Sequence, residues 1–552
     1  MVKIFDLLEM KITRRKFIAG SAASALALGL TPAFKKVFSE KKITGEILGA
    51  SSHIGHKLRG DTFPAPTIFL KKDAVIIGGG IAGLGAGYNF FKSGLTNFAL
   101  LDLEKETGGN SSSGKNEISA YPWGAHYVPL LTDESTEVKK LFEDLGIITG
   151  YKNGLPIYNE FYICADPDER LFIYGRWFEG LVPPVGIDEN EKEQYQRFFA
   201  LMENYKKARG RDGKKVFAIP LDKSSQDKKW LALDQITMAQ WMQQQGFSSV
   251  NLQWYVDYCC RDDFGVKADE TSAWAGIHYF AARCGKAANT ASDNVITWPE
   301  GNGWLAKKLE EPIKKQITNR ALAYKIANRS DGTVDVDYFD VEKNQSVRIN
   351  AKAALVATPR FIAERLIDSK NIKISAQNFS YAPWAVANIT LDKMPRGIGA
   401  DLSWDNVSFN SQLLGYVVAT HQVPQMNPTQ TVITYYWPLT HLNPVEARKE
   451  ALERPYEEWQ KIFLGELFSI HPELKGAVKR LDLKLWGHAM VRPTAGFIWG
   501  KDRKNALKQH PPIFFANSDM SGISIFEEAY TRSVEVSRQV LSYTGNRSLS
   551  KA

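Results

Sequence analysis

The fold of this 552-residue chain is decided by the stretch AVIIGGGIAG at residues 74–83. Its first four residues are apolar and partly β-branched, which predicts a buried parallel strand. The strand leads directly into a Gly-x-Gly-x-x-Gly pattern, and apolar residues at helical spacing follow as far as Ser93-Gly94. A second apolar strand, Phe98 to Leu101, ends in Asp102. Strand, glycine turn, helix, strand and acid in this order are typical of a dinucleotide-binding βαβ unit.

Each glycine of the pattern has its own task. Gly78 permits the tight turn, Gly80 lets the backbone approach a pyrophosphate, and Gly83 lets the helix pack closely on the strand. The helix begins at Ile81 and Ala82, where free N–H groups and a partial positive charge face the phosphates. The alternative is a glycine-rich turn in some other α/β fold.

Asp102 narrows the choice of dinucleotide. A carboxylate at the end of the second strand accepts hydrogen bonds from a ribose 2′-OH and repels a 2′-phosphate. The sequence therefore disfavours NADP, and NAD and FAD remain as candidate cofactors.

The segment that follows Asp102 distinguishes FAD from NAD. Residues 101–111 read LDLEKETGGNS, which resembles the "acid, five residues, Gly-Gly-Arg" motif of the flavin amine oxidase superfamily. This superfamily includes monoamine and polyamine oxidases and, more distantly, phytoene desaturases and protoporphyrinogen oxidase. The resemblance implies that Gly108 and Gly109 let this loop pass close to the FAD phosphates. Asn110 replaces the usual Arg, which calls one phosphate contact into question.

Further segments resemble the same family in the same order along the chain. They are residues 121–126, 298–305, 321–326, 353–359, 513–522 and 526–529. The resemblance implies that Gly124 and Ala125 lie under the isoalloxazine ring and that the strand around Ala323 covers the adenine by backbone contacts. In the C-terminal block it implies that Asp519 binds the ribityl chain and that Glu527 belongs to the cofactor site.

The resemblance also implies the domain organisation. We expect an α/β fold, α+β overall, with a Rossmann-like FAD-binding domain and a discontinuous mixed-sheet substrate domain. The FAD-binding domain would take residues 71–150, 285–365 and 480–545, and the substrate domain residues 151–284 and 366–479. Residues 44–70 would form an N-terminal extension over the surface.

Local patterns predict individual elements in these domains. Apolar positions three and four apart predict helices over 191–209 and 235–262. Apolar or alternating runs predict strands over 384–392, 413–420 and 430–437. Asp331-Gly332 between two apolar runs predicts a hairpin turn.

The first 43 residues are predicted to be a targeting segment. Thr13-Arg14-Arg15-Lys16-Phe17-Ile18 has the pattern of a twin-arginine signal, and the apolar run that follows ends at Leu30. This run is shorter than the ~20 residues that span a bilayer, so no stable membrane span is expected. We expect the twin-arginine export machinery as a partner and a periplasmic location, with a membrane tether if the signal is not cleaved. The alternative is a chance Arg-Arg before an apolar run.

Charge and cysteine content exclude several classes of function. Residues 1–43 hold nine Lys and Arg and three Asp and Glu, so the formal net charge of +8 falls to about +2 without them. This balance argues against a nucleic-acid partner. Cys164, Cys259, Cys260 and Cys284 have no metal-binding spacing, so we expect no metal site and four free or core thiols.

His126 is the candidate catalytic residue. It directly follows the glycine turn expected under the flavin ring, where a neutral imidazole can act as base or proton relay. The competing interpretation is a structural histidine bonded to backbone.

The function predicted from the resemblance is oxidation of an amine, such as a polyamine, by hydride transfer to flavin N5. Two departures weaken the amine-oxidase assignment: residues 384–390 lack the family's lysine, and Ile525 stands where the family has an aromatic residue. The alternatives are FAD-dependent desaturation of an apolar, isoprenoid-like substrate and a non-catalytic flavoprotein that binds a protein partner.

Overall fold

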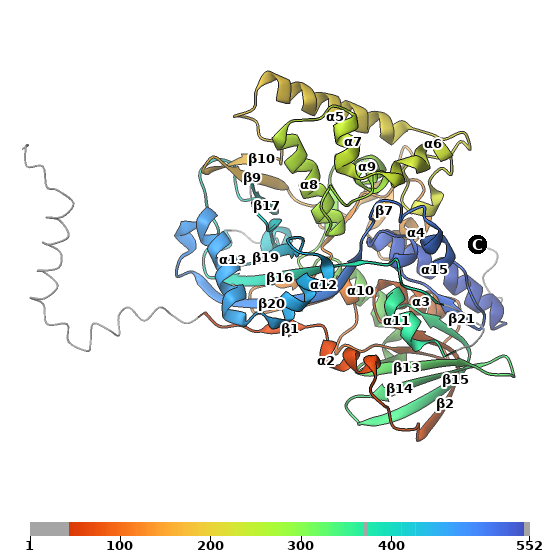
Figure 1. The fold of residues 1–552 in the computed structure, drawn as a ribbon. Coiled ribbons are helices and arrows are strands. Elements are labelled where there is room, and N and C mark those ends of the chain that lie inside the picture. The colour runs from red at the N-terminus through yellow and green to blue at the C-terminus, as the bar shows by residue number, and fades with distance from the viewer. Residues whose placement is uncertain (1–42, 369–371, 373, 410, 425–426, 546–552) are drawn as a thin grey trace, which may run out of the picture. The chain divides into compact units, whose positions relative to one another are not determined.

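The structure is a computed structural model that describes residues 43–368, 372, 374–409, 411–424 and 427–545 (Figure 1). Contacts within the chain separate it into two units, residues 1–43 and residues 44–552. The predicted twin-arginine segment therefore lies outside the described residues apart from Ile43. No helix in the described ranges is long and apolar enough to cross a membrane.

The predicted βαβ unit is confirmed and forms the centre of one sheet, here called sheet I. Strand β2 (Ile68–Ile77) runs into helix α3 (Ile81–Lys92), which returns the chain to β3 (Phe98–Leu101). Parallel pairing extends the sheet in the order β12 (Ile317–Thr318), β3, β2, β15 (Gln345–Val356) and β21 (Ile513–Phe515). The predicted Rossmann-like architecture and α/β class are thus present.

Helices cover one face of sheet I and a meander extends it. Helix α3 packs against α10 (Gly303–Glu310) and α15 (Phe526–Tyr543), and α15 also contacts α4 (Thr136–Asp144). Their apolar sides share a core with β2, because alternate residues of this strand face the helices. Strands β13 (Ala321–Asn328) and β14 (Val334–Asp340) pair antiparallel with each other and with β15.

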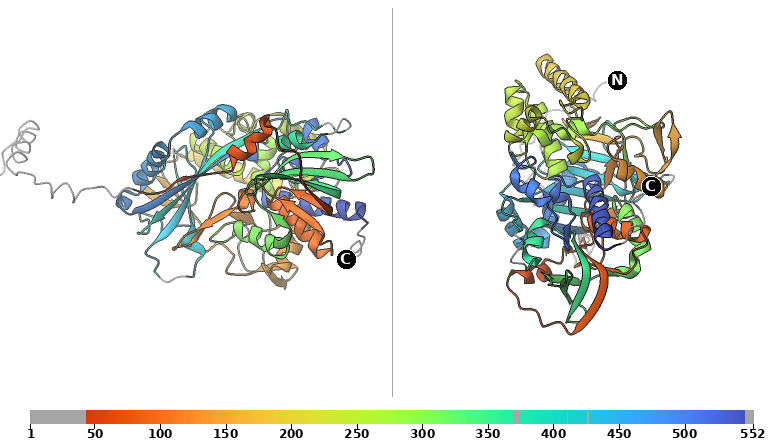
Figure 2. Two further views of the ribbon diagram at one scale, coloured as in Figure 1. Left: turned by 90° about the horizontal axis from the view of Figure 1, so that it is seen from below. Right: turned by 90° about the vertical axis from the view of Figure 1, so that its right-hand side faces the viewer.

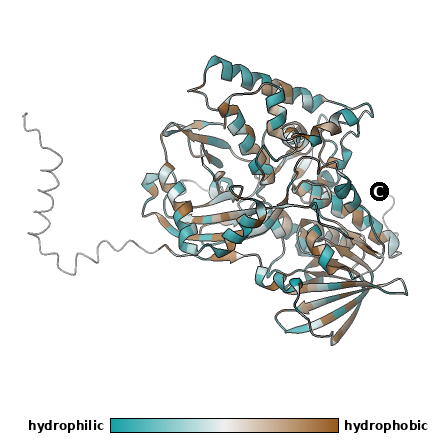
Figure 3. Ribbon diagram, viewed as in Figure 1, coloured by the Kyte–Doolittle hydropathy of each residue, from teal (hydrophilic) through white to brown (hydrophobic). Residues whose placement is uncertain are grey.

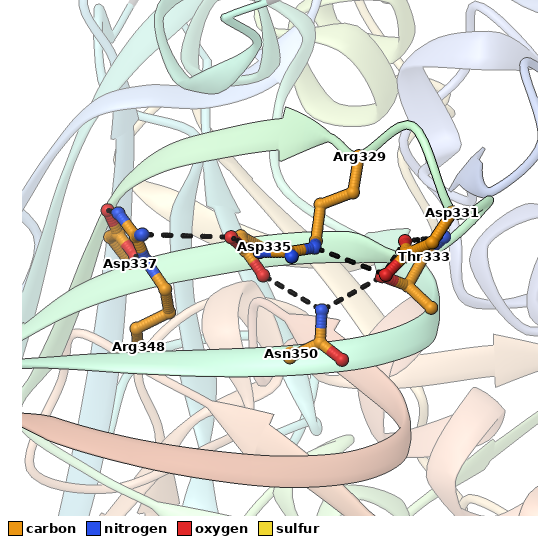
Figure 4. Close-up of polar contacts among 7 residues, drawn as sticks. All are labelled: Arg329, Asp331, Thr333, Asp335, Asp337, Arg348 and Asn350. Atoms are coloured by element: carbon orange, nitrogen blue, oxygen red, sulfur yellow. Dashed lines mark hydrogen bonds and ion pairs between the residues drawn. The ribbon is translucent and has the colours of Figure 1, made fainter.

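The predicted hairpin at Asp331-Gly332 is confirmed as the turn between β13 and β14. A polar network crosses this meander (Figure 4). Arg348 donates to both carboxylate oxygens of the buried Asp337, at 2.7 and 2.8 Å. Arg329 and Asn350 bond to Asp335 at 3.1 and 2.9 Å. The pairs hold neighbouring strands in register at the edge of the sheet.

A second sheet, here called sheet II, is mixed and carries the strands predicted for the substrate domain. Its order is β1 (Ile47–Gly49), β20 (Val478–Val491), β16 (Tyr381–Leu391), β19 (Thr431–Pro438), β18 (Gly415–Val418), β17 (Asp405–Ser408), β9 (Glu169–Ile173) and β10 (Arg176–Glu179). Strands β16, β18 and β19 correspond to the predicted strands. Strand β20 also belongs to this sheet. The predicted boundaries between the two domains stay predictions.

A helical group packs beside sheet II. Helix α5 (Glu189–Lys207) matches the predicted helix and is hydrophilic along much of its length (Figure 3). The single helix predicted over 235–262 is wrong, because the chain forms α7 (Met238–Gln244) and α8 (Val250–Phe264). Gly246 between them has a φ of +73°, which ends α7, and the Ser249 side chain caps α8. Helix α9 (Ala273–Ala282) completes the group.

The N-terminal extension connects the two sheets. Its strand β1 pairs in parallel with β20 of sheet II, and its helix α2 (Ser52–Gly55) then lies against the end of β3. Figure 2 shows α2 between the strands of the two sheets. Ser51 donates from its N–H and its hydroxyl to the Glu104 carboxylate, both at 2.8 Å, which fixes this crossing.

The described chain has further α-helices and β-strands. They are β4 (Ser113–Lys115), β5 (Ala120–Pro122), β6 (Tyr127–Pro129), β7 (Ile148–Lys152), β8 (Leu155–Tyr158), α6 (Lys228–Leu231), β11 (Val295–Thr297), α11 (Arg360–Leu366), α12 (Pro444–Glu453), α13 (Tyr456–Ile470) and α14 (Lys501–Ala506).

The meander network predicts a local stability effect. Arg348→Met removes both donors of a buried carboxylate and is expected to lower the free energy of unfolding by about 1–3 kcal/mol. Lys352→Met breaks a more exposed pair with Asp73 and is expected to cost no more than about 0.5 kcal/mol. Denaturant unfolding of both variants measures the difference, and equal losses would contradict a structural role for the Arg348 pair.

Candidate functional site

The first glycine loop has the geometry of a phosphate cradle. Gly78 has a φ of +106°, and a Cβ on Gly83 would lie 1.8 Å from the Gly78 carbonyl oxygen, so helix α3 starts directly on strand β2. Within the described chain, no side chain caps the start of α3 at Gly80. The first N–H groups of α3, at Ile81 and Ala82, are therefore available to an anion.

The second glycine loop lies alongside the first. Gly108 donates its N–H to the Gly79 carbonyl at 2.7 Å and forms a β-bridge with Gly80. A Cβ on Gly109 would lie 3.2 Å from the Gly80 Cα. The two loops thus form one groove whose walls are backbone, as a closely approaching diphosphate requires.

Asp102 lies at the base of this groove. Its carboxylate accepts hydrogen bonds from the Gly79 N–H at 2.5 Å and the Glu104 N–H at 2.7 Å. Burial raises its pKa to about 6 in spite of these bonds. Each carboxylate oxygen can accept a further bond, so the expected contact with a ribose hydroxyl stays a prediction.

A cavity adjoins the groove and collects several of the predicted site residues. It offers about 900 Å³ of space free of protein atoms, part of it open to solvent. Asn110, Gly124, Ala125, His126 and Glu527 all line it. Its wall also includes β20, since Asn110 donates its side-chain amide to the Ala489 carbonyl and Trp486 donates its indole N–H to the Trp123 carbonyl at 2.6 Å. The cavity therefore lies where sheet II meets the glycine loops.

His126 is held in the cavity wall by backbone and aromatic contacts. Its Nδ1 lies 3.3 Å from the Gly124 carbonyl, and its ring stacks on Tyr436 at 4.6 Å. The Tyr436 hydroxyl donates to the same carbonyl at 3.0 Å. Desolvation lowers the pKa of His126 to about 4, so the imidazole is neutral at pH 7. This pKa suits a hydrogen-bonding or relay group better than a strong base; the catalytic role itself stays a prediction.

Carboxylates form another side of the cavity. Asp263 pairs with Arg283, whose guanidinium lies 4.2 Å from the Tyr279 ring centroid. Asp262, beside it at the end of α8, has no hydrogen-bond or ion-pair partner for its carboxylate among the described residues. Burial, followed by the Asp263 charge, raises the pKa of Asp262 to about 7. Burial also raises the pKa of Glu527 to about 7.

Asp519 and Ala323 lie outside the cavity lining. Asp519 is buried and accepts hydrogen bonds from the Tyr381 hydroxyl at 2.5 Å and the Arg360 N–H at 2.9 Å. Burial raises its pKa to about 6. Ala323 is buried in β13 where the pairing with β14 shifts register. Their expected contacts with the ribityl chain and the adenine stay predictions.

Several cavity residues were not singled out from the sequence. They are Tyr127, Arg283, Trp384, Tyr436 and Trp486. Trp384 and Trp486 are register partners across β16 and β20, a pairing that no local pattern reveals. Among the described residues, no group of three or more His, Cys, Asp or Glu is placed to hold a metal ion, and the four cysteines are free thiols.

Comparisons with known proteins agree with the fold. A family model described as an NAD(P)-binding Rossmann-like domain matches residues 76–145. Wild-type putrescine oxidase bound to putrescine is similar with a TM-score of 0.61 at 13% identity, over 86% of this chain and 100% of that one. Cyclohexylamine oxidase from Brevibacterium oxydans IH-35A has a TM-score of 0.60 at 13% identity, over 85% and 99%. No curated protein sequence matches the chain.

A third similar structure is named for a different activity from the two amine oxidases. The CLA-producing fatty acid isomerase from P. acnes has a TM-score of 0.56 at 15% identity, over 85% of this chain and 98% of that one. At such low identities the likeness establishes the fold, which several activities share. The substrate must therefore be argued from the cavity.

The glycine cradle predicts a sharp difference between two helical glycines. Gly83→Ala is expected to abolish dinucleotide binding and lower the melting temperature, because its Cβ would collide with the Gly78 carbonyl. Gly465→Ala, in α13 with open space around its Cβ, is expected to gain about 0.5–1 kcal/mol. Thermal melts and FAD titration distinguish the two; unchanged FAD affinity in Gly83→Ala would refute the cradle.

Proposed function

We propose that this protein is an FAD-dependent oxidoreductase that oxidises an amine. The paired glycine loops, the uncapped start of α3 and the buried Asp102 suit a dinucleotide lying along the groove. The adjoining cavity suits the flavin end and a substrate above it. The similarity to putrescine and cyclohexylamine oxidases supports the same proposal.

The observation that carries the proposal is the Asp262 carboxylate. It has no ion-pair or hydrogen-bond partner in the described chain, and it lines a cavity whose wall is largely aromatic and apolar. A partly desolvated carboxylate in such surroundings is stabilised by an incoming cation. An ammonium group is a cation of suitable size, and the aromatic side chains Tyr127 and Tyr436 line the same cavity.

The residues of the cavity have separate roles in the proposed reaction. Bound FAD would supply the hydride acceptor for the carbon next to the amine nitrogen. Asp262 attracts the ammonium form, and the surrounding apolar wall favours loss of the proton that must leave before oxidation. Neutral His126, fixed by Tyr436 and the Gly124 carbonyl, is positioned to pass this proton on. Trp384 and Trp486 add large aromatic side chains to the cavity wall.

An apolar substrate is the second candidate. The fatty acid isomerase shares the fold, and the missing lysine of residues 384–390 and Ile525 depart from the amine-oxidase pattern. Asp262 counts against this candidate, since an apolar ligand would leave its carboxylate without a partner. A non-catalytic flavoprotein would require neither Asp262 nor His126 in the cavity.

Asp262 predicts a pH-dependent affinity for amines. Its pKa of about 7 means that the carboxylate becomes charged as the pH rises from 6 to 8, so the KM for a diamine is expected to fall over this range. In Asp262→Asn the KM is expected to be at least about tenfold higher at pH 8 and to lose this dependence. Asp269→Asn, on the exposed loop after α8, is the matched control. Steady-state kinetics of the FAD-loaded protein with a panel of diamines gives the comparison; a KM unchanged in Asp262→Asn would contradict the proposed amine site.

We also propose that the protein is exported to the periplasm by the twin-arginine route, with residues 1–43 as the signal. Replacing Arg14 and Arg15 together by Lys is expected to leave the protein in the cytoplasm, because this route depends on the arginine pair. Cell fractionation followed by immunoblotting measures the outcome. Export unaffected by the double replacement would refute the proposed signal.

A further inference from the structure

Strand β20 of sheet II carries a lysine towards the glycine loops of sheet I. The Nζ of Lys484 lies 3.0 Å from the Ser112 hydroxyl, just after the second glycine loop. Its ammonium lies 4.3 Å from the ring centroid of Trp486, which lines the cavity two residues further along the strand. Lys484 thus stands beside the groove, between the Gly108-Gly109 turn and the cavity.

The Lys484 ammonium has no carboxylate within ion-pair distance among the described residues, although the side chain is half-buried. Burial lowers its pKa to about 8 even though Glu104, Glu106 and Asp102 act in the opposite direction. A partly desolvated cation without a carboxylate to balance its charge is costly to the folded protein. An anion that entered the groove would remove this cost.

The second glycine loop needs such a cation if it faces a diphosphate. Residues 102–110 carry Asp102, Glu104 and Glu106 against the single cation Lys105, and Asn110 stands where an arginine is usual in the family that the chain resembles. A second cation near this loop, Arg320, donates a hydrogen bond to the Ser51 hydroxyl. This hydroxyl in turn donates to the Glu104 carboxylate. Positive charge for the phosphates must therefore come largely from the start of α3 and from outside the loop.

We propose that Lys484 is a cofactor-binding residue whose ammonium pairs with the diphosphate of the bound dinucleotide, in place of the arginine that Asn110 replaces. The proposal rests on the FAD site proposed above. It also assigns a second effect to the cofactor: the diphosphate connects β20 of sheet II to the glycine loops of sheet I.

The test is direct titration of FAD into the full-length apoprotein, followed by flavin fluorescence at several salt concentrations. Lys484→Met keeps most of the stem over Trp486 and removes the charge. Its dissociation constant for FAD is expected to rise at least tenfold and to depend less on salt than that of the wild type. Lys484→Arg is expected to restore most of the affinity. Lys479→Met, on the same strand but paired with Asp392 away from the cavity, is the matched control and is expected to bind FAD normally.

The outcomes separate this inference from the proposed function. A wild-type protein that binds no FAD refutes the proposed function itself. A wild-type protein that binds FAD, together with a Lys484→Met variant of equal affinity, overturns only the assignment of Lys484. The assignment is also overturned if Lys484→Arg binds as weakly as Lys484→Met while both apoproteins melt at the wild-type temperature, because a charge contact would then be absent.

Discussion

The contact between Gly83 and the Gly78 carbonyl is the constraint on which the rest of the site depends. Because Gly83 has no Cβ, helix α3 can begin close to the end of β2. Its first N–H groups then point into the groove. The Gly108-Gly109 loop follows this backbone closely through the bond from Gly108 to Gly79. The Asp102 carboxylate accepts hydrogen bonds from the Gly79 N–H in the first loop and from the Glu104 N–H in the segment that leads to the second loop.

The cavity is a product of two sheets that are built from distant parts of the chain. The chain after the second glycine loop of sheet I supplies Asn110, and sheet II supplies β16 and β20 with Trp384 and Trp486. Lys484 of β20 lies beside the cavity, next to Ser112. The extension at the N-terminus pairs with β20 and bonds through Ser51 to Glu104, so it connects both sheets close to the groove. The proposed cofactor would lie between the sheets and contact residues of both.

Local sequence patterns predicted the βαβ unit, the hairpin at Asp331-Gly332 and three strands of sheet II, β16, β18 and β19, because each depends on residues close in sequence. The break between α7 and α8 was missed, since the helical spacing of apolar residues continues across Gly246. The sequence also indicated His126 and Asn110. It did not show that the charged groups of Asp262 and Lys484 lack an ion-pair partner among the described residues. Those properties depend on contacts between β20, α8 and loops far away in the chain, which only the folded structure brings together.

The most direct test of this account is a crystal structure of the full-length protein with FAD. We expect the diphosphate to lie between the start of α3 and the Gly108-Gly109 loop, and the isoalloxazine ring to lie in the cavity beside Asn110, His126 and Trp486. We also expect open space between the ring and Asp262 for an amine. A flavin bound elsewhere, or a groove that stays without a nucleotide at saturating FAD, would contradict the central claim.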